Sequence, residues 1–267
     1  MPNFDANYIP KSAMTIFAHP DDTEFSAAGT IAKWAQSGCE VTLVVCTSGN
    51  VGTHDPKHTS ETLADTRKKE QKAAAKMLGV KHVVLLGHDD CQLQPTLELR
   101  RELVREIRKY KPEVVICGQP DGWLYGNEYI NHPDHRAAAA AALEAVFPCA
   151  EMELLWPEEG KAHKVHAVYV RSDDRPDVWV DITNAIDLKV ESLRAHSSQM
   201  VDWDRMVAWD PDKMIREWAA AEAKAGRKKM KSAKNKKGKK QKGKMKYAEA
   251  FRVMKLKDEE KPAEVKE

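Results

Sequence analysis

Two short segments of this sequence place histidine and aspartate close together, in a pattern that suits a metal ion. The first reads HPDD over residues 19–22, and the second reads HPDH over residues 132–135. Adjacent carboxylates suit a divalent cation, and neighbouring histidines narrow the choice toward zinc or a similar transition metal. One such motif is more often a cap or a surface arrangement. Two of them in one chain favour a metal site.

A catalytic zinc ion takes three protein ligands and keeps one position open for water. His19, Asp22 and His135 can supply these ligands for one zinc ion per chain. Zinc lowers the pKa of its bound water to about 7, and the neighbouring Asp21 carboxylate can accept the proton. His132 can stabilise the oxyanion or protonate a leaving amine. The motifs therefore predict hydrolysis with Asp21 and His132 as catalytic residues.

Both motifs lie at the boundaries of predicted secondary structure. An apolar run over residues 13–18 ends at HPDD, and Pro133 can occupy the first position of an alanine-rich helix. Three further apolar runs alternate with helical patterns. The predicted strands are 13–18, 41–47, 82–87 and 113–118, and helices are predicted up to Gly38, over 61–79, over 97–110 and from Pro133. This alternation predicts an α/β fold, a mostly parallel sheet with helices on both faces.

The predicted sheet would bring the two motifs together. Ligands of such sheets bind at the carboxyl ends of the strands, and the fourth strand is next to the first in common strand orders. A nucleotide-binding protein would carry a glycine-rich turn where this chain has two carboxylates, which would repel a phosphate. In the first turn of its helix, Asp134 either orients a ligand imidazole or favours the positive end of the helix, and both interpretations stay open.

The C-terminal part shows a weaker alternation. Two β-rich runs, 165–170 and 178–183, are separated by a polar turn and predict an antiparallel addition to the sheet. A helix is expected over 184–196, and Trp203, Trp209 and Trp218 are expected to bury against the body or a neighbouring subunit. The expected organisation is a single catalytic domain over 1–226, a Lys-rich flexible loop over 227–246 and a segment over 247–267 that docks on the domain.

Charge argues against a polyanionic partner. The chain has 267 residues and a net charge of +2, but residues 227–246 contain 12 lysines or arginines and no acid. The rest of the chain then carries 31 basic and 41 acidic residues, a net charge of −10. Such a surface suits neither nucleic acid nor an anionic membrane. Self-association is left open.

Cysteine usage and hydropathy indicate a cytoplasmic protein. The five cysteines form no CxxC pair, and their odd number argues against a complete disulfide framework. The first residues lack a basic segment followed by an apolar run, so they do not resemble a secretory signal. No stretch approaches the roughly 18 apolar residues of a membrane span.

Three segments together resemble the PIG-L/LmbE-like family of zinc-dependent N-acetylglucosaminyl deacetylases. They read AHPDDTEFSAAGTIAKWAQSGCEVTLVVCTSGNVG, RKKEQKAAAKMLGV and NHPDHRAAAAAAL. The resemblance covers about residues 13 to 200, and the two motifs in this order are specific. It implies a Rossmann-like fold and the removal of acetate from N-acetylglucosamine-type groups, with the zinc ligands and catalytic residues named above.

The resemblance also bears on substrate contacts. It implies that Arg67 contacts the substrate and, more weakly, that Asp90 does. Ser48 and Asn50 stand where many members carry acids near the sugar, which leaves the identity of the N-acetylated sugar or glycoconjugate open. The aromatic residues of segment 120–130 (Trp123, Tyr125 and Tyr129) either form a wall for a sugar ring or pack a long loop.

Two other functions fit parts of the sequence. The same metal ligands would serve hydrolysis of another amide or of a phosphoester. A non-enzymatic alternative is a metal-stabilised scaffold whose basic run over 227–246 binds RNA. His196 lies outside both motifs and either enters the site from the C-terminal region or, as is usual for a lone histidine, is structural.

Overall fold

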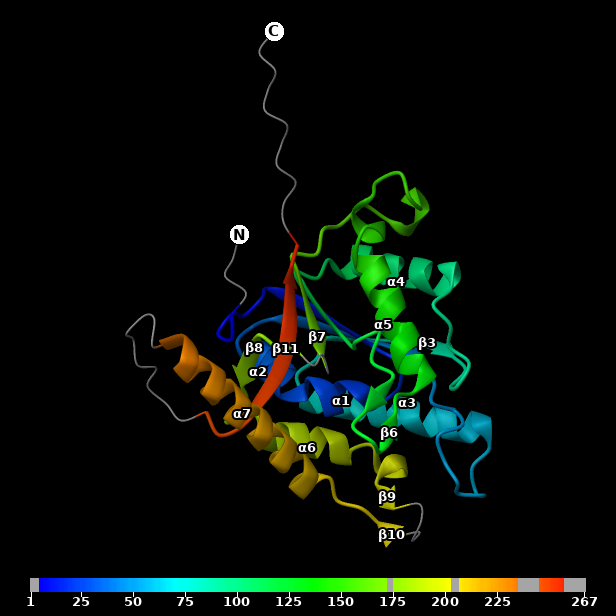
Figure 1. Ribbon diagram of the computed structural model, residues 1–267. Coiled ribbons are helices and arrows are strands. Elements are labelled where there is room, and N and C mark those ends of the chain that lie inside the picture. The colour runs from blue at the N-terminus through cyan, green and yellow to red at the C-terminus, as the bar shows by residue number, and fades with distance from the viewer. Residues whose placement is uncertain (1–4, 172–174, 203–206, 235–244, 257–267) are drawn as a thin grey trace.

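A seven-stranded sheet in the order β3-β2-β1-β4-β7-β11-β8 forms the centre of the computed structural model (Figure 1). The structure describes residues 5–171, 175–202, 207–234 and 245–256. The strands are β1 (Ser12–Phe17), β2 (Glu40–Thr47), β3 (His82–His88), β4 (Val114–Cys117), β7 (Ala167–Arg171), β8 (Val178–Asp181) and β11 (Ala248–Lys255). Two small antiparallel pairs are β5 (Leu124–Tyr125) with β6 (Tyr129–Ile130), and β9 (Val201–Asp202) with β10 (Val207–Ala208). Strand β1 pairs in parallel with β2 on one side and with β4 on the other.

Helices cover both faces of this sheet, as predicted. They are α1 (Asp22–Ser26), α2 (Ala28–Gln36), α3 (Ser60–Met77), α4 (Leu97–Tyr110), α5 (Pro133–Val146), α6 (Ile186–Arg194) and α7 (Asp212–Lys234), with short 3₁₀ turns at Cys149–Glu151, Pro157–Glu159 and Ser197–Gln199. Side chains of α2, α6 and α7 pack with Phe17 of β1, whereas α4 and α5 pack with Ile16 on the opposite face. Strand β1 is apolar and buried along almost its whole length because both faces are covered. The predicted fold class is confirmed.

The helix predicted up to Gly38 is α2, and a short additional helix, α1, precedes it with a break at Ala27. No side chain of this segment caps α2. Instead, Glu249 of β11 accepts hydrogen bonds from two amides in the first turn of α2, at 3.0 and 2.7 Å. Lys189 of α6 donates to two main-chain carbonyls at the end of α1, at 3.0 and 2.7 Å, and pairs with Glu249 at 2.7 Å. This buried ion pair therefore satisfies the main chain on both sides of the break.

The C-terminal strands differ from the prediction. Strands β7 and β8 do not pair, because β11 lies between them and is antiparallel to both (Figure 1). Both runs join the same sheet and the C-terminal addition is antiparallel, as predicted, but 165–170 and 178–183 do not pair with each other, because the antiparallel strand between them is β11. Two strands close in sequence favour a hairpin, but here the pairing partner comes from about 70 residues later. Segment 247–267 was expected to dock on the catalytic domain. Within it, β11 is an interior strand of the sheet, and residues 257–267 lie outside the described residues.

Helix α7 extends into the Lys-rich run. Residues 227–234 are helical rather than loop, which agrees with the good helix propensity of lysine, and residues 235–244 lie outside the described residues. Trp218 of α7 is 52% exposed and so is not buried against the body of this chain, whereas Trp209 packs partly buried against the core. Trp203 lies outside the described residues.

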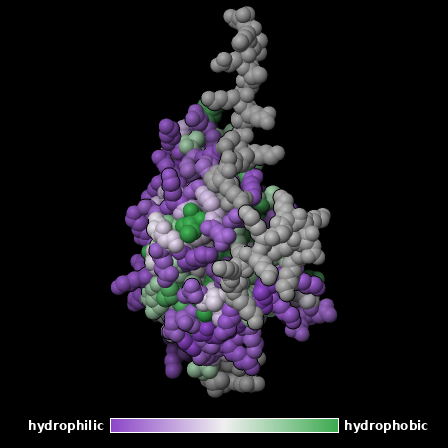
Figure 2. Space-filling view, turned by 90° about the vertical axis from the view of Figure 1, so that its left-hand side faces the viewer, coloured by the Kyte–Doolittle hydropathy of each residue, from purple (hydrophilic) through white to green (hydrophobic). Residues whose placement is uncertain are grey.

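The α7 and β8 side of the molecule is largely hydrophilic, with small separate hydrophobic areas (Figure 2). Among the described helices, none is long and apolar enough to cross a membrane. All five cysteines are free.

Candidate active site

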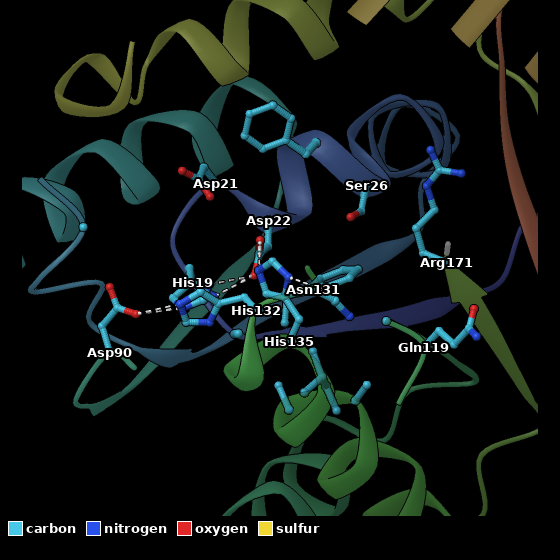
Figure 3. Close-up of a pocket in the computed structure, with 18 of the residues that line it drawn as sticks. His19, Asp21, Asp22, Ser26, Asp90, Gln119, Asn131, His132, His135 and Arg171 are labelled. Carbon is cyan, nitrogen blue, oxygen red and sulfur yellow. Dashed lines mark hydrogen bonds and ion pairs between the residues drawn. The ribbon is translucent and has the colours of Figure 1, made fainter. Parts of the chain in front are cut away.

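The HPDD and HPDH segments meet beside a cavity of about 610 Å³ (Figure 3). HPDD leaves β1 and enters α1, where Asp21 is the N-cap with a positive φ of 94°. HPDH begins α5, with His132 as the N-cap and Pro133 as the first helical residue. Because β1 and β4 are neighbours, the segments that follow them lie on the same edge of the sheet. The predicted convergence is confirmed.

The three predicted metal ligands direct their donor atoms toward one point. Oδ1 of Asp22 lies 3.1 Å from His135 Nε2, and its Oδ2 lies 3.5 Å from His19 Nδ1. One donor atom from each residue falls within 4.8 Å of the others. The His19 amide donates to Asp22 Oδ2 at 2.8 Å, which holds the carboxylate in place. Two imidazoles and one carboxylate make a donor set that zinc accepts, so the residues present fit this ion.

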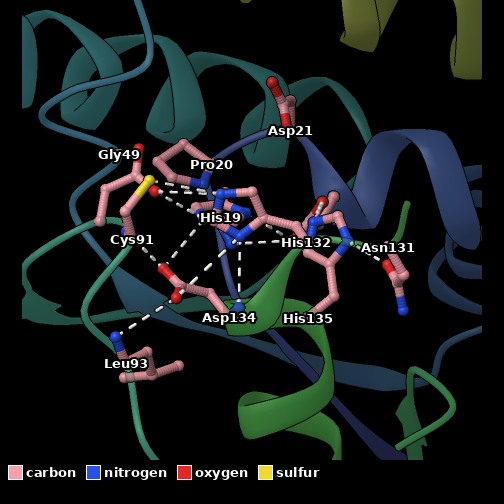
Figure 4. A network of polar contacts seen from close by, with 12 residues as sticks. His19, Pro20, Asp21, Gly49, Cys91, Leu93, Asn131, His132, Asp134 and His135 are labelled. Atoms are coloured by element: carbon pink, nitrogen blue, oxygen red, sulfur yellow. Dashed lines mark hydrogen bonds and ion pairs between the residues drawn. The ribbon is translucent and has the colours of Figure 1, made fainter. Parts of the chain in front are cut away.

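Hydrogen bonds behind the two histidines determine which ring nitrogen faces the metal position (Figure 4). Asn131 Nδ2 donates to the Gly122 carbonyl at 2.7 Å, so Asn131 Oδ1 is the atom that lies 3.0 Å from His135 Nδ1. His135 Nδ1 therefore carries the proton and Nε2 is available to a metal. Similarly, Asp90 Oδ1 lies 2.9 Å from His19 Nε2, which leaves His19 Nδ1 available. Such outer hydrogen bonds orient metal-binding imidazoles.

Asp134 is fully buried below the metal position. Its two oxygens accept from main-chain amides of the loop before α4, at 2.7 and 3.3 Å, and Oδ2 lies 3.4 Å from His19 Nε2. Together with Asp90 and His132 these residues form a second group whose donor atoms also lie within 4.8 Å. Because amides and His19 Nε2 already engage the carboxylates, we interpret this group as a hydrogen-bonding layer behind the ligands.

The three candidate ligands have strongly shifted pKa values. Burial works against charge on His19, but its contacts with the three surrounding carboxylates outweigh burial and raise its pKa to about 12. Burial also opposes charge on His135, and Asp22 outweighs it, so the pKa of His135 is raised. Burial would raise the pKa of Asp22, yet the two histidines hold that pKa well below its usual range. Three buried carboxylates around two histidines favour a cation.

Asp21 stands apart from the ligand cluster, on the α3 side of the cavity (Figure 3). Its Oδ2 accepts from Arg67 Nη2 at 3.2 Å. Burial raises the pKa of Asp21, and the Arg67 guanidinium opposes this only in part. A raised pKa moves a carboxylate toward the range of a general base.

Arg67 is 4% exposed and lies between the HPDD turn and the loop after β2. Besides Asp21, it donates to the main-chain carbonyls of Pro20 at 2.6 Å and Gly49 at 3.0 Å. It still lines the cavity, so a substrate contact stays a prediction, but its hydrogen bonds give it a clear role in holding the turn.

His132 lines the same cavity and is 29% exposed at its side chain. Its Nδ1 accepts from the Asp134 amide at 3.2 Å, which places the ring proton on Nε2. Burial, followed by the charge of His19, lowers the pKa of His132. A neutral imidazole that keeps this proton remains a hydrogen-bond donor to an oxyanion or to a leaving amine.

Asp90 is 4% exposed and is held by the Asn50 side chain, whose Oδ1 accepts from the Asp90 amide at 2.9 Å. Burial would raise the pKa of Asp90, but the contact with His19 outweighs it and lowers the pKa to about 2. This placement gives Asp90 a role in orienting a metal ligand. Its expected contact with substrate stays a prediction.

Aromatic residues form part of the cavity wall. Tyr125 and Tyr129 line the cavity from the β5–β6 hairpin, with ring centroids 6.1 Å apart. Trp123 instead stacks on the Arg136 guanidinium, which lies 3.7 Å from its ring centroid. Trp218 of α7 also lines the cavity. Of the aromatic residues of segment 120–130, the two tyrosines therefore line the cavity, whereas Trp123 is 62% exposed and contacts α5, and a role of the tyrosines as a wall for a sugar ring stays a prediction.

Sequence reasoning missed two buried amides beside the site. Asn131 is four residues before His135 and Gln71 is four residues after Arg67, so helical spacing connects each to a predicted site residue. That spacing alone could not identify them, because the hydrogen bonds of Asn131 also depend on the loop before α5, and those of Gln71 on the turn after β1.

Comparison with known families matches residues 14–146 to PIG-L, the GlcNAc-PI de-N-acetylases. The chain is 34% identical over 206 residues to the diacetylchitobiose deacetylase of Thermococcus kodakarensis, covering 75% of this chain and 74% of that protein. The structure of N,N'-diacetylchitobiose deacetylase from Pyrococcus horikoshii gives a TM-score of 0.77 at 28% identity, covering 94% of this chain and 88% of that one.

A third relative shares the fold only. The 4-carboxy-2-hydroxymuconate hydratase GalB from Pseudomonas putida gives a TM-score of 0.71 at 23% identity and covers 95% of this chain and 100% of that one. One fold can carry different reactions, so the function must be argued from the site and from the more similar deacetylases.

Proposed function

The chain belongs to the PIG-L family of GlcNAc-PI de-N-acetylases, and on that basis we propose that it removes acetate from an N-acetylated amino sugar, or from a glycoconjugate that carries one. We assign one zinc ion per chain to His19, Asp22 and His135. The observation that carries the proposal is that the metal-binding atoms of these three residues lie close together beside one cavity, which Asp21 and His132 also line.

The metal ligands are prepared for a cation by their neighbours. A zinc ion bound there supplies Lewis acidity, which makes water acidic enough to lose its proton near pH 7. The hydrogen bonds of Asn131 and Asp90 determine which nitrogen of each histidine is directed to the metal position. Asp22 contacts both histidines, so the three ligands form a connected unit.

Two further residues divide the proton transfers between them. Asp21, whose pKa is raised by burial, accepts the proton of the attacking water, and Arg67 keeps its carboxylate from rotating away. His132 keeps its proton on Nε2 and donates a hydrogen bond from there to the oxyanion of the acetamide, while the proton that Asp21 took from water passes to the leaving amine. The products are acetate and a free amino sugar.

The substrate class follows from the relatives together with the cavity. The compared deacetylases act on diacetylchitobiose, by their names, which supports an N-acetylglucosamine-type ring at the metal end of the cavity. Tyr125 and Tyr129 offer ring faces of the kind that pack against a sugar. Trp218, on α7, provides a further aromatic surface for the group attached to that ring.

Metal analysis of the purified protein, coupled to an acetate-release assay on N-acetylated glycosides and chitooligosaccharides, tests this proposal. The Asp21→Asn variant should retain stoichiometric zinc but release acetate at least about 100-fold more slowly, because it lacks the general base. The Asp65→Asn variant, on the exposed face of α3, is the matched control and should behave like the parent.

Three results would contradict the proposal. Unimpaired turnover by Asp21→Asn would remove Asp21 from the reaction. Phosphate release from phosphoesters without acetate release would assign the site to a different hydrolysis. RNA binding that depends steeply on salt, in a protein without hydrolytic activity, would favour the scaffold alternative.

A further inference from the structure

The backbone of Asp21 has an unusual conformation that no capping hydrogen bond of its own side chain stabilises. Its φ of 94° and ψ of −25° lie in a region that non-glycine residues rarely adopt. As a result of this conformation, the side chain of Asp22 lies toward His19 and His135, whereas that of Asp21 lies on the α3 side (Figure 3). As the N-cap of α1, Asp21 makes no side-chain capping hydrogen bond. The contacts that hold it must come from elsewhere in the fold.

Gln71 of α3 supplies such a contact from a fully buried position. Its Oε1 accepts from the Asp21 amide at 3.0 Å, and its Nε2 donates to Glu24 Oε1 at 2.9 Å. The Asp21 amide can only donate, so Oε1 of Gln71 faces Asp21, and Nε2 faces the Glu24 oxygen that accepts its hydrogen bond. These two contacts together give the Gln71 amide its orientation.

Glu24 has an ion-pair partner on its far side. It is fully buried, and its Oε2 lies 3.4 Å from Nε2 of His196, which is also fully buried and directly follows α6. Burying polar side chains is unfavourable unless their hydrogen bonds are made, and an apolar set would fill this space at lower cost. Three buried polar residues in a row behind Asp21 therefore indicate a positioning role.

Helix α3 holds the turn at two positions, one helical turn apart. Arg67 contacts the Asp21 carboxylate and the Pro20 carbonyl, and Gln71 contacts the Asp21 amide. Arg67 can hold the carboxylate only while the backbone presents it, because a rotation of φ toward negative values would carry the side chain away. Asp22 has separate contacts to His19 and His135, which do not involve Gln71.

We propose that Gln71, oriented by Glu24, is a positioning residue that keeps the main chain of Asp21 in its left-handed conformation and thereby keeps the Asp21 carboxylate at the reaction centre. The inference rests on the proposed role of Asp21 as general base. Loss of the Gln71 acceptor lets the turn relax and moves the base, whereas the metal ligands stay in place. Proton transfer is affected and metal binding is not.

The test first removes the hydrogen-bond acceptor at position 71 and then restores it in a double variant that also changes position 24. The methionine of Gln71→Met has a similar length to glutamine but no hydrogen-bond acceptor. Because small misplacements of a catalytic group are costly, kcat of this variant should fall at least about 10-fold. Its KM should stay within about 2-fold of the parent value, and it should still bind stoichiometric zinc. Gln71→Glu sets two carboxylates against each other and should be similarly impaired. The double variant Gln71→Glu/Glu24→Gln keeps an acceptor for the Asp21 amide and exchanges donor and acceptor only in the hydrogen bond between positions 71 and 24, so it should recover most of kcat.

Glu70→Gln is the matched control, because Glu70 is next to Gln71 and 8% exposed but accepts its hydrogen bonds from Ser197 and Ser198. It should keep kcat within about 2-fold even if thermal stability falls. An unchanged kcat in Gln71→Met, or a double variant no better than Gln71→Glu, would overturn the positioning role. The double variant keeps the test available if Gln71→Met does not fold.

Failure of this inference is distinguishable from failure of the proposed function. If Asp21→Asn is inactive while Gln71→Met retains full kcat, only the positioning role is lost. If Asp21→Asn retains full kcat, the general base has been assigned wrongly and the inference falls with it. A structure of Gln71→Met gives an independent readout, since φ of Asp21 should become negative.

Discussion

The buried ion pair between Lys189 and Glu249 makes a sharp prediction about stability. The two side chains are 4% and 1% exposed, and they meet at the break between α1 and α2. Burial lowers the pKa of Lys189 even though Glu249 is beside it. The pKa of Glu249 is also lowered, because Lys189 and the α2 amides outweigh the effect of burial. The carboxylate is therefore better compensated than the ammonium.

This asymmetry predicts different costs for the two halves of the pair. Glu249→Gln leaves a buried ammonium with carbonyl partners only, which should destabilise the protein by about 3–5 kcal/mol. Lys189→Met leaves a carboxylate that still accepts two amide hydrogen bonds at a helix N-terminus, so a smaller cost of about 1–3 kcal/mol is expected. The double variant Glu249→Gln/Lys189→Met should cost less than the sum, because neither charge is left buried alone.

Urea unfolding followed by circular dichroism measures these differences in the free energy of unfolding. In a thermal scan, each kcal/mol of destabilisation should lower Tm by about 2–4 °C for a protein of this size. Asp210→Asn serves as the control, since it removes an exposed ion pair with Arg194 and should cost less than about 1 kcal/mol. The reasoning is refuted if Glu249→Gln costs less than Lys189→Met, or if the two single costs add in the double variant.

Three further predictions follow from other buried contacts. Asn131→Ala removes the acceptor for His135 Nδ1 and should weaken zinc binding about 10- to 100-fold in a chelator competition; unchanged affinity would exclude this role. Arg108, 2% exposed, donates to six main-chain carbonyls between residues 149 and 160, so Arg108→Met should destabilise the protein by at least about 3 kcal/mol and make that loop sensitive to protease. Arg105, together with a second arginine, lowers the pKa of Glu159 from 4.5 to about 2, so this carboxylate stabilises the fold above pH 4.5 and the contribution is lost as the pH falls toward 2. Glu159→Gln should remove that part of the acid dependence of Tm, and an identical profile would contradict the assignment.

The sequence by itself determined the parallel half of the fold and the convergence of the two motifs. Apolar runs of strand length alternate with helical patterns up to Pro133, and each pattern depends on residues close in the chain. Since parallel strands end at a common edge, His19, Asp22 and His135 could be placed together before any coordinates were known. Their roles as zinc ligands, and that of Asp21 as the base, remain proposals.

Only the tertiary structure decided which groups surround these residues. Strand β11 enters the sheet between β7 and β8 and delivers Glu249 to the start of α2, about 220 residues away in sequence. Gln71 and Asn131 are ordinary amides in the sequence, and their contacts with Asp21 and His135 exist only after α3 and α5 have packed. Helices and strands can be predicted from the periodicity of residues that are close in the chain. The contacts of Glu249, Gln71 and Asn131 depend on how distant elements pack, and no short segment of the sequence contains that information.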